Sequence, residues 1–299
     1  MSLEELRDAF RKGSLTKPAY IDAMHERHRV LHEYAELMKG TQVAKIEIAD
    51  GRVTMTMRDT GLQLVCDPAD KRLAPVEALN FGAYEKAELD QVCSLLRPGD
   101  TVLDVGANVG FYTLTLARRV PGLALHAFEP IPRTFAALER HLALNDVKAK
   151  AHPFGFSDVA AEKTFYFYPE GSGNASAANL TGGASVEEVR CRVERLDDFV
   201  RREKIVPDFV KCDVEGAELL VFKGGLETLR AHRPAILTEM LRKWSAPFGY
   251  HPNEIIDLLA GLGYRCLTLR AGQLVPFAHM DESTVETNFF FLHPSRHAL

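Results

Sequence analysis

Four carboxylate residues follow short apolar runs at widely separated points of the chain. They are Asp104 after Val102–Leu103, Glu129 after Leu125–Phe128, Asp213 after Phe209–Cys212 and Glu239 after Ala235–Thr238. Such runs, alternating with helical patterns, are typical of parallel strands buried on both faces. Because the carboxyl ends of parallel strands meet at one edge of a sheet, where ligands bind, we expect the four carboxylates on one rim. Carboxylates in that position can accept hydrogen bonds from ligand hydroxyls or remove a proton.

A glycine turn precedes the second of these residues. The segment Thr101–Gly110 predicts a strand that turns into a helix at Gly106 and Gly110, where the missing Cβ atoms let a ligand approach the backbone. Glu129 follows at the spacing where an acidic side chain meets a ribose in βαβ nucleotide sites. Its two oxygens match two ribose hydroxyls, so the segment indicates a nucleoside pocket.

The charge at this turn favours a cationic cofactor over a dinucleotide. A dinucleotide fingerprint needs a third glycine, and Asp104 at the strand end would repel a diphosphate. The same carboxylate would attract an ammonium and a neighbouring sulfonium, which points to S-adenosylmethionine (SAM). In the alternative interpretation Asp104 only caps the next turn, and Gly106 and Gly110 only allow helix and strand to pack closely.

Several blocks of the chain resemble the FkbM-type methyltransferases of the class I SAM-dependent superfamily. The matching blocks are Phe81–Glu85, Pro98–Gly110, Phe128–Pro130, Gly155–Asp158, Lys211–Glu218 and Gly263–Tyr264. The glycine turn is common to the superfamily, whereas the Asp213–Glu218 block is more particular to this family. The resemblance implies an α/β fold with a Rossmann-like, mostly parallel sheet of seven strands. It also implies methyl transfer, usually to an oxygen of a sugar or secondary metabolite.

The expected cofactor site combines the glycine turn with residues at neighbouring strand ends. Tyr84–Glu85 are expected as a lid over the methionine end, Ser157–Asp158 at the adenine edge and Pro130–Ile131 against the ring face. The predicted cofactor-binding residues are Tyr84, Glu85, Asp104, Gly106, Ala107, Asn108, Gly110, Phe111, Glu129, Pro130, Ile131, Ser157, Asp158 and Asp213.

Asp213 is the first candidate for the general base that methyl transfer to a hydroxyl needs. Glu239 and His251 are further catalytic candidates, the histidine because its ordinary pKa lies near working pH. Glu215 is a candidate for substrate contact and, with Glu218, an alternative base, although both also suit a helix N-terminus. Asp213, Glu215 and Glu239 carry the hard oxygen ligands that magnesium prefers, but no ligand spacing marks a metal site and none is predicted.

Two irregular stretches, 171–183 and 242–251, are expected to select the acceptor. Trp244 can stack on a sugar face, and His251 can donate hydrogen bonds to it. The alternative is that aromatic side chains of the second stretch pack against the N-terminal appendage.

The chain divides into an N-terminal appendage, 1–78, and a catalytic domain, 79–299. Ser2 and Glu5 form a capping box before a helical region, and two alternating runs around Asp50-Gly51 predict a β-hairpin. The appendage is expected either to cover the acceptor site or to pair subunits, and a homodimer is slightly preferred.

Composition narrows the classes of partner. The formal charge of −5 argues against nucleic acid, and no apolar run reaches the length of a membrane span. Five scattered cysteines and an N-terminus without signal-peptide organisation favour a reduced, cytoplasmic protein. The resulting hypothesis is a SAM-dependent O-methyltransferase for a sugar, glycan or other small acceptor. The alternatives are an NAD-dependent oxidoreductase and a non-catalytic SAM-binding subunit.

Overall fold

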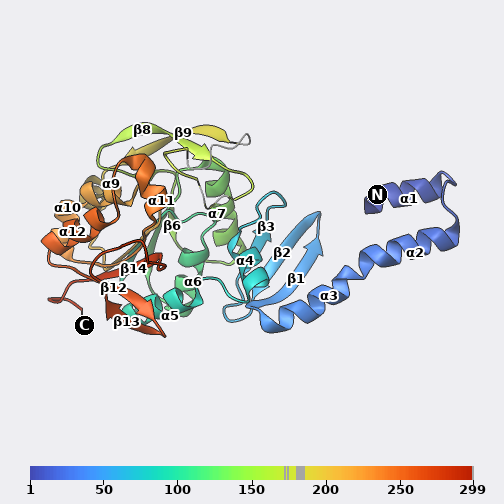
Figure 1. Cartoon of the computed structure of the whole chain (residues 1–299), viewed down its shortest axis with the longest axis horizontal. Coiled ribbons are helices and arrows are strands. Elements are labelled where there is room, and N and C mark those ends of the chain that lie inside the picture. The colour runs from blue at the N-terminus through green and yellow to red at the C-terminus, as the bar shows by residue number, and fades with distance from the viewer. Residues whose placement is uncertain (172, 174, 180–185, 298–299) are drawn as a thin grey trace.

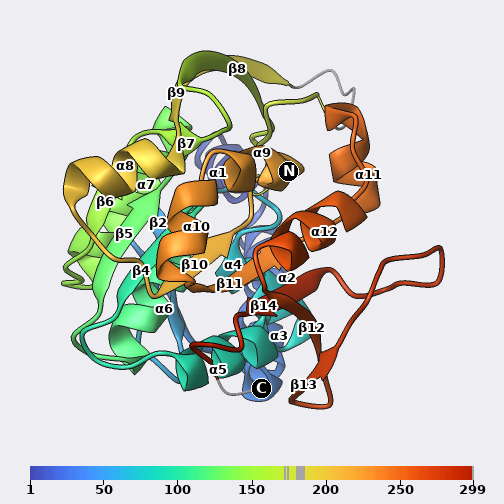
Figure 2. The ribbon, with the colours of Figure 1, turned by 90° about the vertical axis from the view of Figure 1, so that its left-hand side faces the viewer.

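The computed structural model describes residues 1–171, 173, 175–179 and 186–297. Its centre is an eight-stranded sheet in the order β13-β12-β14-β11-β10-β4-β5-β6, seen from the β6 edge to the β13 edge in Figure 2. The bounds are β4 (Thr101–Val105), β5 (Ala124–Phe128), β6 (Lys150–His152), β10 (Phe209–Cys212), β11 (Ala235–Glu239), β12 (Arg265–Arg270), β13 (Gln273–Pro276) and β14 (Asn288–Leu292).

Strand direction explains where the polar residues gather. Strands β6, β5, β4, β10 and β11 run parallel, whereas β14 is antiparallel to both of its neighbours, β11 and β12. The expected count of seven strands is one too low, because the chain turns back after β12 and adds β13 as an antiparallel edge strand. The α/β class and the mostly parallel order are as expected.

Alternate residues of the central strands bury opposite faces of the sheet. Val102 and Phe209 pack in one apolar cluster with helices α5, α6 and α7, whereas Leu103 and Val210 pack in another with α8, α9, α10 and α12. Because the central strands are buried on both faces, their sequences are nearly continuous apolar runs. The helices are α5 (Lys86–Leu95), α6 (Phe111–Arg119), α7 (Pro132–Leu144), α8 (Leu196–Glu203), α9 (Glu218–Lys223), α10 (Leu226–His232), α11 (Arg242–Ser245) and α12 (Asn253–Gly261).

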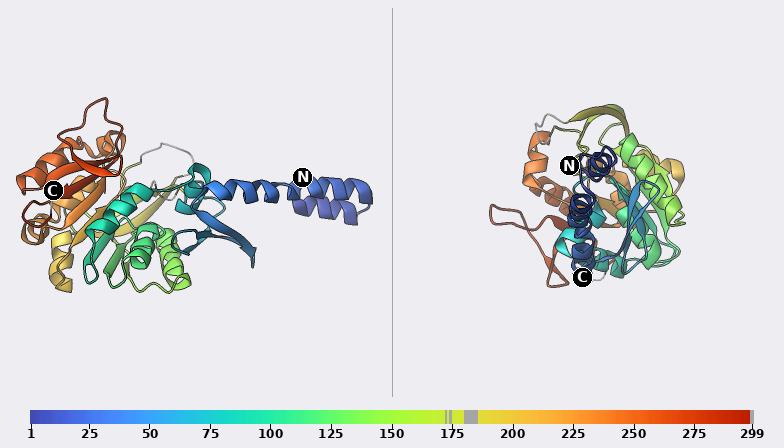
Figure 3. Two further views of the ribbon diagram at one scale, coloured as in Figure 1. Left: turned by 90° about the horizontal axis from the view of Figure 1, so that it is seen from below. Right: turned by 90° about the vertical axis from the view of Figure 1, so that its right-hand side faces the viewer.

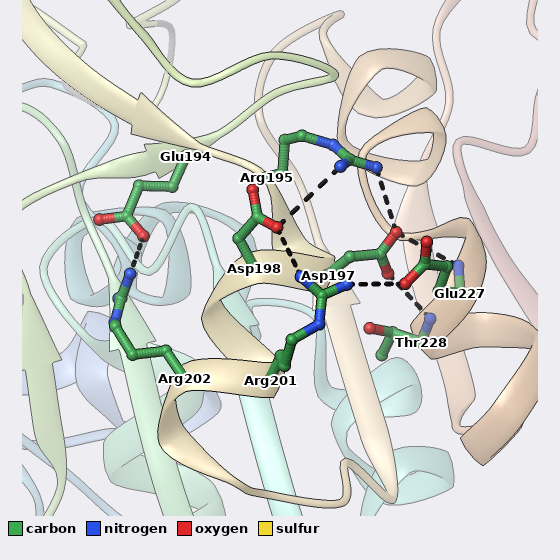
Figure 4. A network of polar contacts seen from close by, with 8 residues as sticks. All are labelled: Glu194, Arg195, Asp197, Asp198, Arg201, Arg202, Glu227 and Thr228. Carbon is green, nitrogen blue, oxygen red and sulfur yellow. Dashed lines mark hydrogen bonds and ion pairs between the residues drawn. The ribbon is translucent and has the colours of Figure 1, made fainter.

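A second sheet, in the order β7-β9-β8, lies above the main sheet in Figure 1. Its strands are β7 (Gly155–Phe156), β8 (Ala161–Phe167) and β9 (Glu187–Glu194). A polar network ties it to the helices below (Figure 4): Arg202 of α8 donates to Glu194 of β9 at 2.6 Å. Buried Asp197 accepts from the Thr228 N–H at 2.8 Å and so holds the start of α10 against α8.

Three N-terminal helices form an arm that projects away from the body (Figures 1 and 3). They are α1 (Leu3–Arg11), α2 (Lys17–His28) and α3 (Val30–Leu37), followed by a short 3-10 turn at Met38–Gly40. The predicted capping box of Ser2 and Glu5 is present, and the Phe10 and Tyr20 rings stack at 4.5 Å between α1 and α2. Ile21 and Leu31 are each 54% exposed on this arm. A homodimer stays a prediction.

The expected hairpin is confirmed and gains a third strand. Strands β1 (Val43–Ala49), β2 (Arg52–Met57) and β3 (Gln63–Cys66) form an antiparallel sheet. The β3 backbone bonds to α7 and the residue after it, because the Val65 N–H donates to His141 Nε2 at 3.0 Å and the Gln63 N–H to Asn145 Oδ1 at 2.7 Å. Helix α4 (Ala74–Phe81) then leads to α5. The small sheet shares an apolar cluster with the main sheet, and the domain boundary after residue 78 stays a prediction.

No helix among the described residues combines the length and the apolar character needed to cross a bilayer. All five cysteines are free thiols.

Candidate active site

A cavity of about 430 Å³ lies at the carboxyl ends of β4, β5, β10 and β11. It is lined by most of the predicted site residues: Tyr84, Glu85, Gly106, Ala107, Asn108, Phe111, Glu129, Pro130, Ile131, Asp213, Glu215, Glu239 and Trp244. The convergence of Glu129, Asp213 and Glu239 on one rim is therefore confirmed. Five predicted residues do not line this cavity: Asp104, Gly110, Ser157, Asp158 and His251.

Asp104 turns into the protein instead of toward a ligand. Its Oδ2 accepts from the N–H of Thr113 at 3.1 Å and from the Thr113 hydroxyl at 2.6 Å, and its side chain is 1% exposed. The carboxylate thus holds the first turn of α6, as in the alternative interpretation. Asp104 does not line the cavity, so the expected contact between Asp104 and a cofactor ammonium gains no support from this structure.

Gly110 serves helix packing rather than ligand approach. It precedes α6 with φ at +91°, and a Cβ there would lie 2.6 Å from Leu138 Cδ1 of α7. The positive φ favours glycine, and a Cβ would also crowd the Leu138 side chain. Gly110 does not line the cavity, so the expected cofactor contact there gains no support either.

His251 is exposed, and among the described residues its hydrogen bonds join it to neighbours at the start of α12. Its N–H donates to Glu254 Oε1 at 3.2 Å, and its Nδ1 accepts from the Asn253 N–H at 3.2 Å. Because His251 does not reach the cavity, its predicted roles as base and substrate contact do not fit this structure.

Ser157 lines a smaller pocket that adjoins the main one. The two pockets share Gly106, Pro130, Phe165 and Val214. The Ser157 hydroxyl accepts from Lys163 Nζ at 2.7 Å and donates to Asp158 Oδ1 at 3.0 Å. Asp158 borders neither pocket as the described residues form them, so its expected contact with the adenine edge is not seen.

Glu129 joins the glycine turn to the end of β5. Its Oε2 accepts from the Asn108 N–H at 3.0 Å, and its Oε1 accepts from the Ile131 N–H at 2.9 Å. Burial raises the pKa of Glu129 to about 7, although the two N–H groups oppose the rise. Each carboxylate oxygen can accept a second hydrogen bond. Glu129 is thus placed to bind a pair of ligand hydroxyls.

Tyr84 and Glu85 line the opposite part of the cavity as expected, and Tyr112 supports them. The Tyr112 hydroxyl donates to Glu85 Oε2 at 2.6 Å, and the Tyr84 ring meets the Phe111 ring edge-on at 5.4 Å. Burial raises the pKa of Glu85. Sequence reasoning missed Tyr112, because aromatic residues in an apolar helix give no signal of a polar contact.

Lys211 is the buried cation of the site and was also missed. Its Nζ lies 3.3 Å from Asp213 Oδ2 and 3.8 Å from Asp104 Oδ1, and it donates to the Gly106 carbonyl at 2.9 Å. Burial disfavours the ammonium, but the charges of Asp213, Asp104 and Glu85 outweigh it and raise the pKa of Lys211. The sequence feature that could have identified Lys211 is a single lysine within the otherwise apolar strand β10.

Asp213, Glu215 and Glu239 form a carboxylate cluster in which one oxygen from each lies within 4.8 Å of the others. Burial, followed by the charge of Asp213, raises the pKa values of Glu215 and Glu239 well above the ordinary range. Glu215 has a left-handed backbone with φ at +53°. The cluster therefore places three carboxyl groups close together beside the Gly106 turn, where the ionisation of Glu215 and Glu239 is disfavoured.

The turn after β10 is fixed by Glu218 and Tyr250. Glu218 Oε1 accepts from the N–H groups of Val214 at 3.0 Å and Gly216 at 3.1 Å. The Tyr250 hydroxyl donates to the Gly216 carbonyl at 2.8 Å. Tyr250 thus packs against this turn and not against the N-terminal appendage.

Trp244 of α11 lines the cavity beside the same turn. A Cβ on Gly216 would lie 2.2 Å from the Trp244 carbonyl oxygen, so the two segments are in backbone contact. Lys243 Nζ lies 4.2 Å from the centre of the Trp244 ring. Of the other predicted acceptor stretch, Gly173 and Ala175 line the cavity, whereas residues 172, 174 and 180–183 lie outside the described residues.

The sequence profile described as "Methyltransferase FkbM domain" matches residues 104–266, which is more than half of the chain. The chain belongs to the FkbM methyltransferase family. The resemblance seen in the sequence is thus confirmed, and the large, mostly parallel sheet that it implied is present.

Similar proteins include "31-O-demethyl-FK506 methyltransferase FkbM" of Streptomyces tacrolimicus, 33% identical over 43% of this chain and 60% of that protein. "Methyltransferase 1" of Beauveria bassiana is 33% identical over 42% of this chain and 59% of its own length. "2-O-methyltransferase NoeI" of Sinorhizobium fredii is 28% identical over 48% and 65%. The chain thus spans about 60% of the length of the first two relatives. A crystal structure of methyltransferase FkbM from Methylobacillus flagellatus is 14% identical, with a TM-score of 0.44 over 90% of this chain and 60% of that one.

Proposed function

We propose that this protein is a SAM-dependent methyltransferase that methylates a hydroxyl oxygen of a sugar, glycan or secondary metabolite. The observation that carries the proposal is that Glu129 and Asp213 line one cavity around the Gly106 turn. Membership of the FkbM family supports methyl transfer, and one similar protein is named a 31-O-demethyl-FK506 methyltransferase and another a 2-O-methyltransferase.

The described residues fit the cofactor. Glu129 offers two carboxylate oxygens with remaining acceptor capacity for ribose hydroxyls, and Gly106 lines the cavity in close backbone contact with Asp213. Tyr84 and Glu85 are proposed at the methionine end, and the side pocket with Ser157 at the adenine. When bound, SAM would supply an electrophilic methyl group on a sulfonium.

Asp213 is proposed to take the proton of the acceptor hydroxyl. Its carboxylate is 30% exposed on the cavity side, and the Lys211 ammonium lies 3.3 Å away. A neutral hydroxyl is a poor nucleophile, so a carboxylate within hydrogen-bond reach assists its attack. The role of Lys211 is to hold the Asp213 side chain in place through this ion pair.

Trp244 is proposed to orient the acceptor. It is the single tryptophan of the chain and lines the cavity near Glu215 and Glu239. The face of an indole ring packs well against the C–H face of a sugar or a macrocyclic ring. Alignment of the acceptor oxygen with the methyl carbon is the main demand of this reaction on the protein.

The test is calorimetric titration with S-adenosylhomocysteine and, separately, with NADH. We expect binding of S-adenosylhomocysteine, its loss in Glu129→Ala, its retention in the exposed-site control Glu162→Ala, and no binding of NADH. Preference for NADH would support the oxidoreductase alternative and overturn the proposal. If Asp213→Ala leaves methyl transfer to a screened acceptor intact, the proposed base is wrong, and if the wild type never turns over, the non-catalytic alternative is favoured.

A further inference from the structure

We propose that Asp213, Glu215 and Glu239 form a site for a divalent cation with oxygen ligands, such as Mg²⁺ or Mn²⁺. The sequence does not mark this site, because Glu239 is far from the other two residues along the chain. The proposed effect of the cation on an acceptor rests on the proposed methyltransferase function. The proposed binding of the cation is independent of that function.

The first observation is the geometry of the cluster. One oxygen from each of the three carboxylates lies within 4.8 Å of the other two. Oxygens that bind one octahedral Mg²⁺ at about 2.1 Å are separated by about 3 to 4 Å. Small side-chain rotations would therefore bring the three oxygens onto one ion, and the cavity leaves its remaining positions to water or an acceptor.

The second observation is an unpartnered oxygen. Glu215 Oε2 is inaccessible to solvent and has no hydrogen-bond partner among the described residues. Two glutamates of the site outside the cluster have donors: Glu129 receives two backbone N–H groups, and Glu85 receives the Tyr112 hydroxyl. A buried carboxylate without a donor costs free energy unless a cation or a proton compensates it. The unpartnered oxygen of Glu215 therefore indicates a ligand, because no described side chain around it compensates the carboxylate.

The third observation is the balance of charge. Lys211, the buried ammonium nearest the cluster, is already shared between Asp213 and Asp104. Lys243 Nζ lies over the Trp244 ring. No ion pair of Glu215 or Glu239 is formed within the part of the chain that the structure describes. A divalent cation would supply the missing positive charge.

The position of the site suggests its use. Asp213 is both a proposed ligand and the proposed base, and Trp244 borders the same cavity. A cation there would bind the acceptor hydroxyl and lower its pKa, which eases proton removal. Two adjacent oxygens of a sugar or other vicinal diol would chelate the ion, so we infer that the preferred acceptor carries such a pair.

The experiment titrates the full chain with Mn²⁺. Free Mn²⁺ is followed by electron paramagnetic resonance, and the paramagnetic ion should quench the fluorescence of Trp244, the single tryptophan. We expect one saturable site with a dissociation constant below about 1 mM. Glu215→Gln and Glu239→Gln should each weaken binding by about tenfold or more.

Glu85→Gln is the matched control, because Glu85 is a buried carboxylate of the same cavity outside the cluster. It should keep the Mn²⁺ site within a few-fold. Thermal unfolding checks the fold: Mn²⁺ should raise the melting temperature of the wild type and of Glu85→Gln but not of the two cluster variants.

Absence of saturable binding, or equal binding by both cluster variants and the wild type, would overturn the site. S-adenosylhomocysteine binding in the presence of EDTA separates this result from the proposed function. If the nucleoside binds and Mn²⁺ does not, only the cation site fails. If Mn²⁺ binds and the nucleoside does not, the cation site stands, whereas the methyltransferase proposal and the acceptor inference built on it fail.

Discussion

Gly106 and Asp213 are in backbone contact, so close that a Cβ on Gly106 would lie 1.8 Å from the Asp213 carbonyl oxygen. The turn proposed to hold the cofactor and the residue proposed as base therefore position each other directly. Lys211 adds to this contact, because it donates to the Gly106 carbonyl and pairs with the Asp213 carboxylate. A disturbance of one segment must move the other.

Gly106→Ala is expected to abolish S-adenosylhomocysteine binding. The added Cβ collides with backbone, which cannot rotate away, and Gly106 also has a φ of +79°. The matched control is Gly99→Ala, where φ is +97° but the space around a Cβ is open. The control should lose only about 1 kcal/mol of unfolding free energy and keep its affinity. Equal affinity in both variants, measured by calorimetry, would contradict the steric argument.

Glu129→Gln is expected to weaken S-adenosylhomocysteine binding by about 10- to 100-fold, since hydrogen bonds to a charged acceptor are lost. The pKa of Glu129 is raised to about 7 by burial. Wild-type affinity should therefore fall as pH drops below about 7, where the carboxylate becomes protonated. The variant should show a flatter pH profile, and a pH dependence as steep as that of the wild type would assign the titration to another group.

Glu129 also predicts the sign of a stability difference. A carboxyl whose pKa is raised on folding stabilises the protein below its unfolded pKa, and this contribution is lost as pH rises through the folded value of about 7. The melting temperature of ligand-free Glu129→Gln, relative to wild type, should therefore increase between about pH 5.5 and pH 8. Other titrating groups cancel in this comparison. A relative decrease over that interval would contradict the burial of an ionisable Glu129.

Lys211→Met is expected to lower the free energy of unfolding by about 3 to 5 kcal/mol, because it leaves buried Asp104 without its ion-pair partner. Lys243→Met is the control: Lys243 lines the same cavity, but its Nζ lies over the Trp244 ring. It should change stability by less than about 1 kcal/mol. Urea denaturation measures both, and equal effects would mean that Lys211 is not the structural cation of the site.

Tyr250→Phe tests the support of the turn after β10. Loss of its hydrogen bond to the Gly216 carbonyl should cost about 1 kcal/mol of unfolding free energy. Affinity for S-adenosylhomocysteine should stay unchanged, because Glu218 still holds the Val214 and Gly216 N–H groups. Tyr34→Phe, on the exposed arm, should have no effect on stability in urea denaturation. A large loss of nucleoside affinity in Tyr250→Phe would show that Tyr250 supports the cofactor side of the cavity as well.

Local features of the sequence determined the central strands and the carboxylates that gather at their carboxyl ends. Apolar runs of strand length, a glycine turn and the carboxylates that follow them predicted β4, β5, β10 and β11 and the convergence of Glu129, Asp213 and Glu239. These predictions succeed because strand burial and turn conformation depend mainly on neighbouring residues. The FkbM-type blocks identified the family for the same reason, since each block is contiguous.

Only the tertiary structure decided which side chains reach the cavity. Asp104 lies one residue before the end of β4, and its side chain meets Thr113 and Lys211, because its orientation depends on the helix and the strand packed beside it. His251 and Asp158 stay outside the cavity for similar reasons. Lys211 of β10 pairs with Asp104 of β4, and the lack of a partner for the Glu215 oxygen depends on which distant segments pack around it. Packing between distant segments sets those contacts, and no local pattern of residues encodes it.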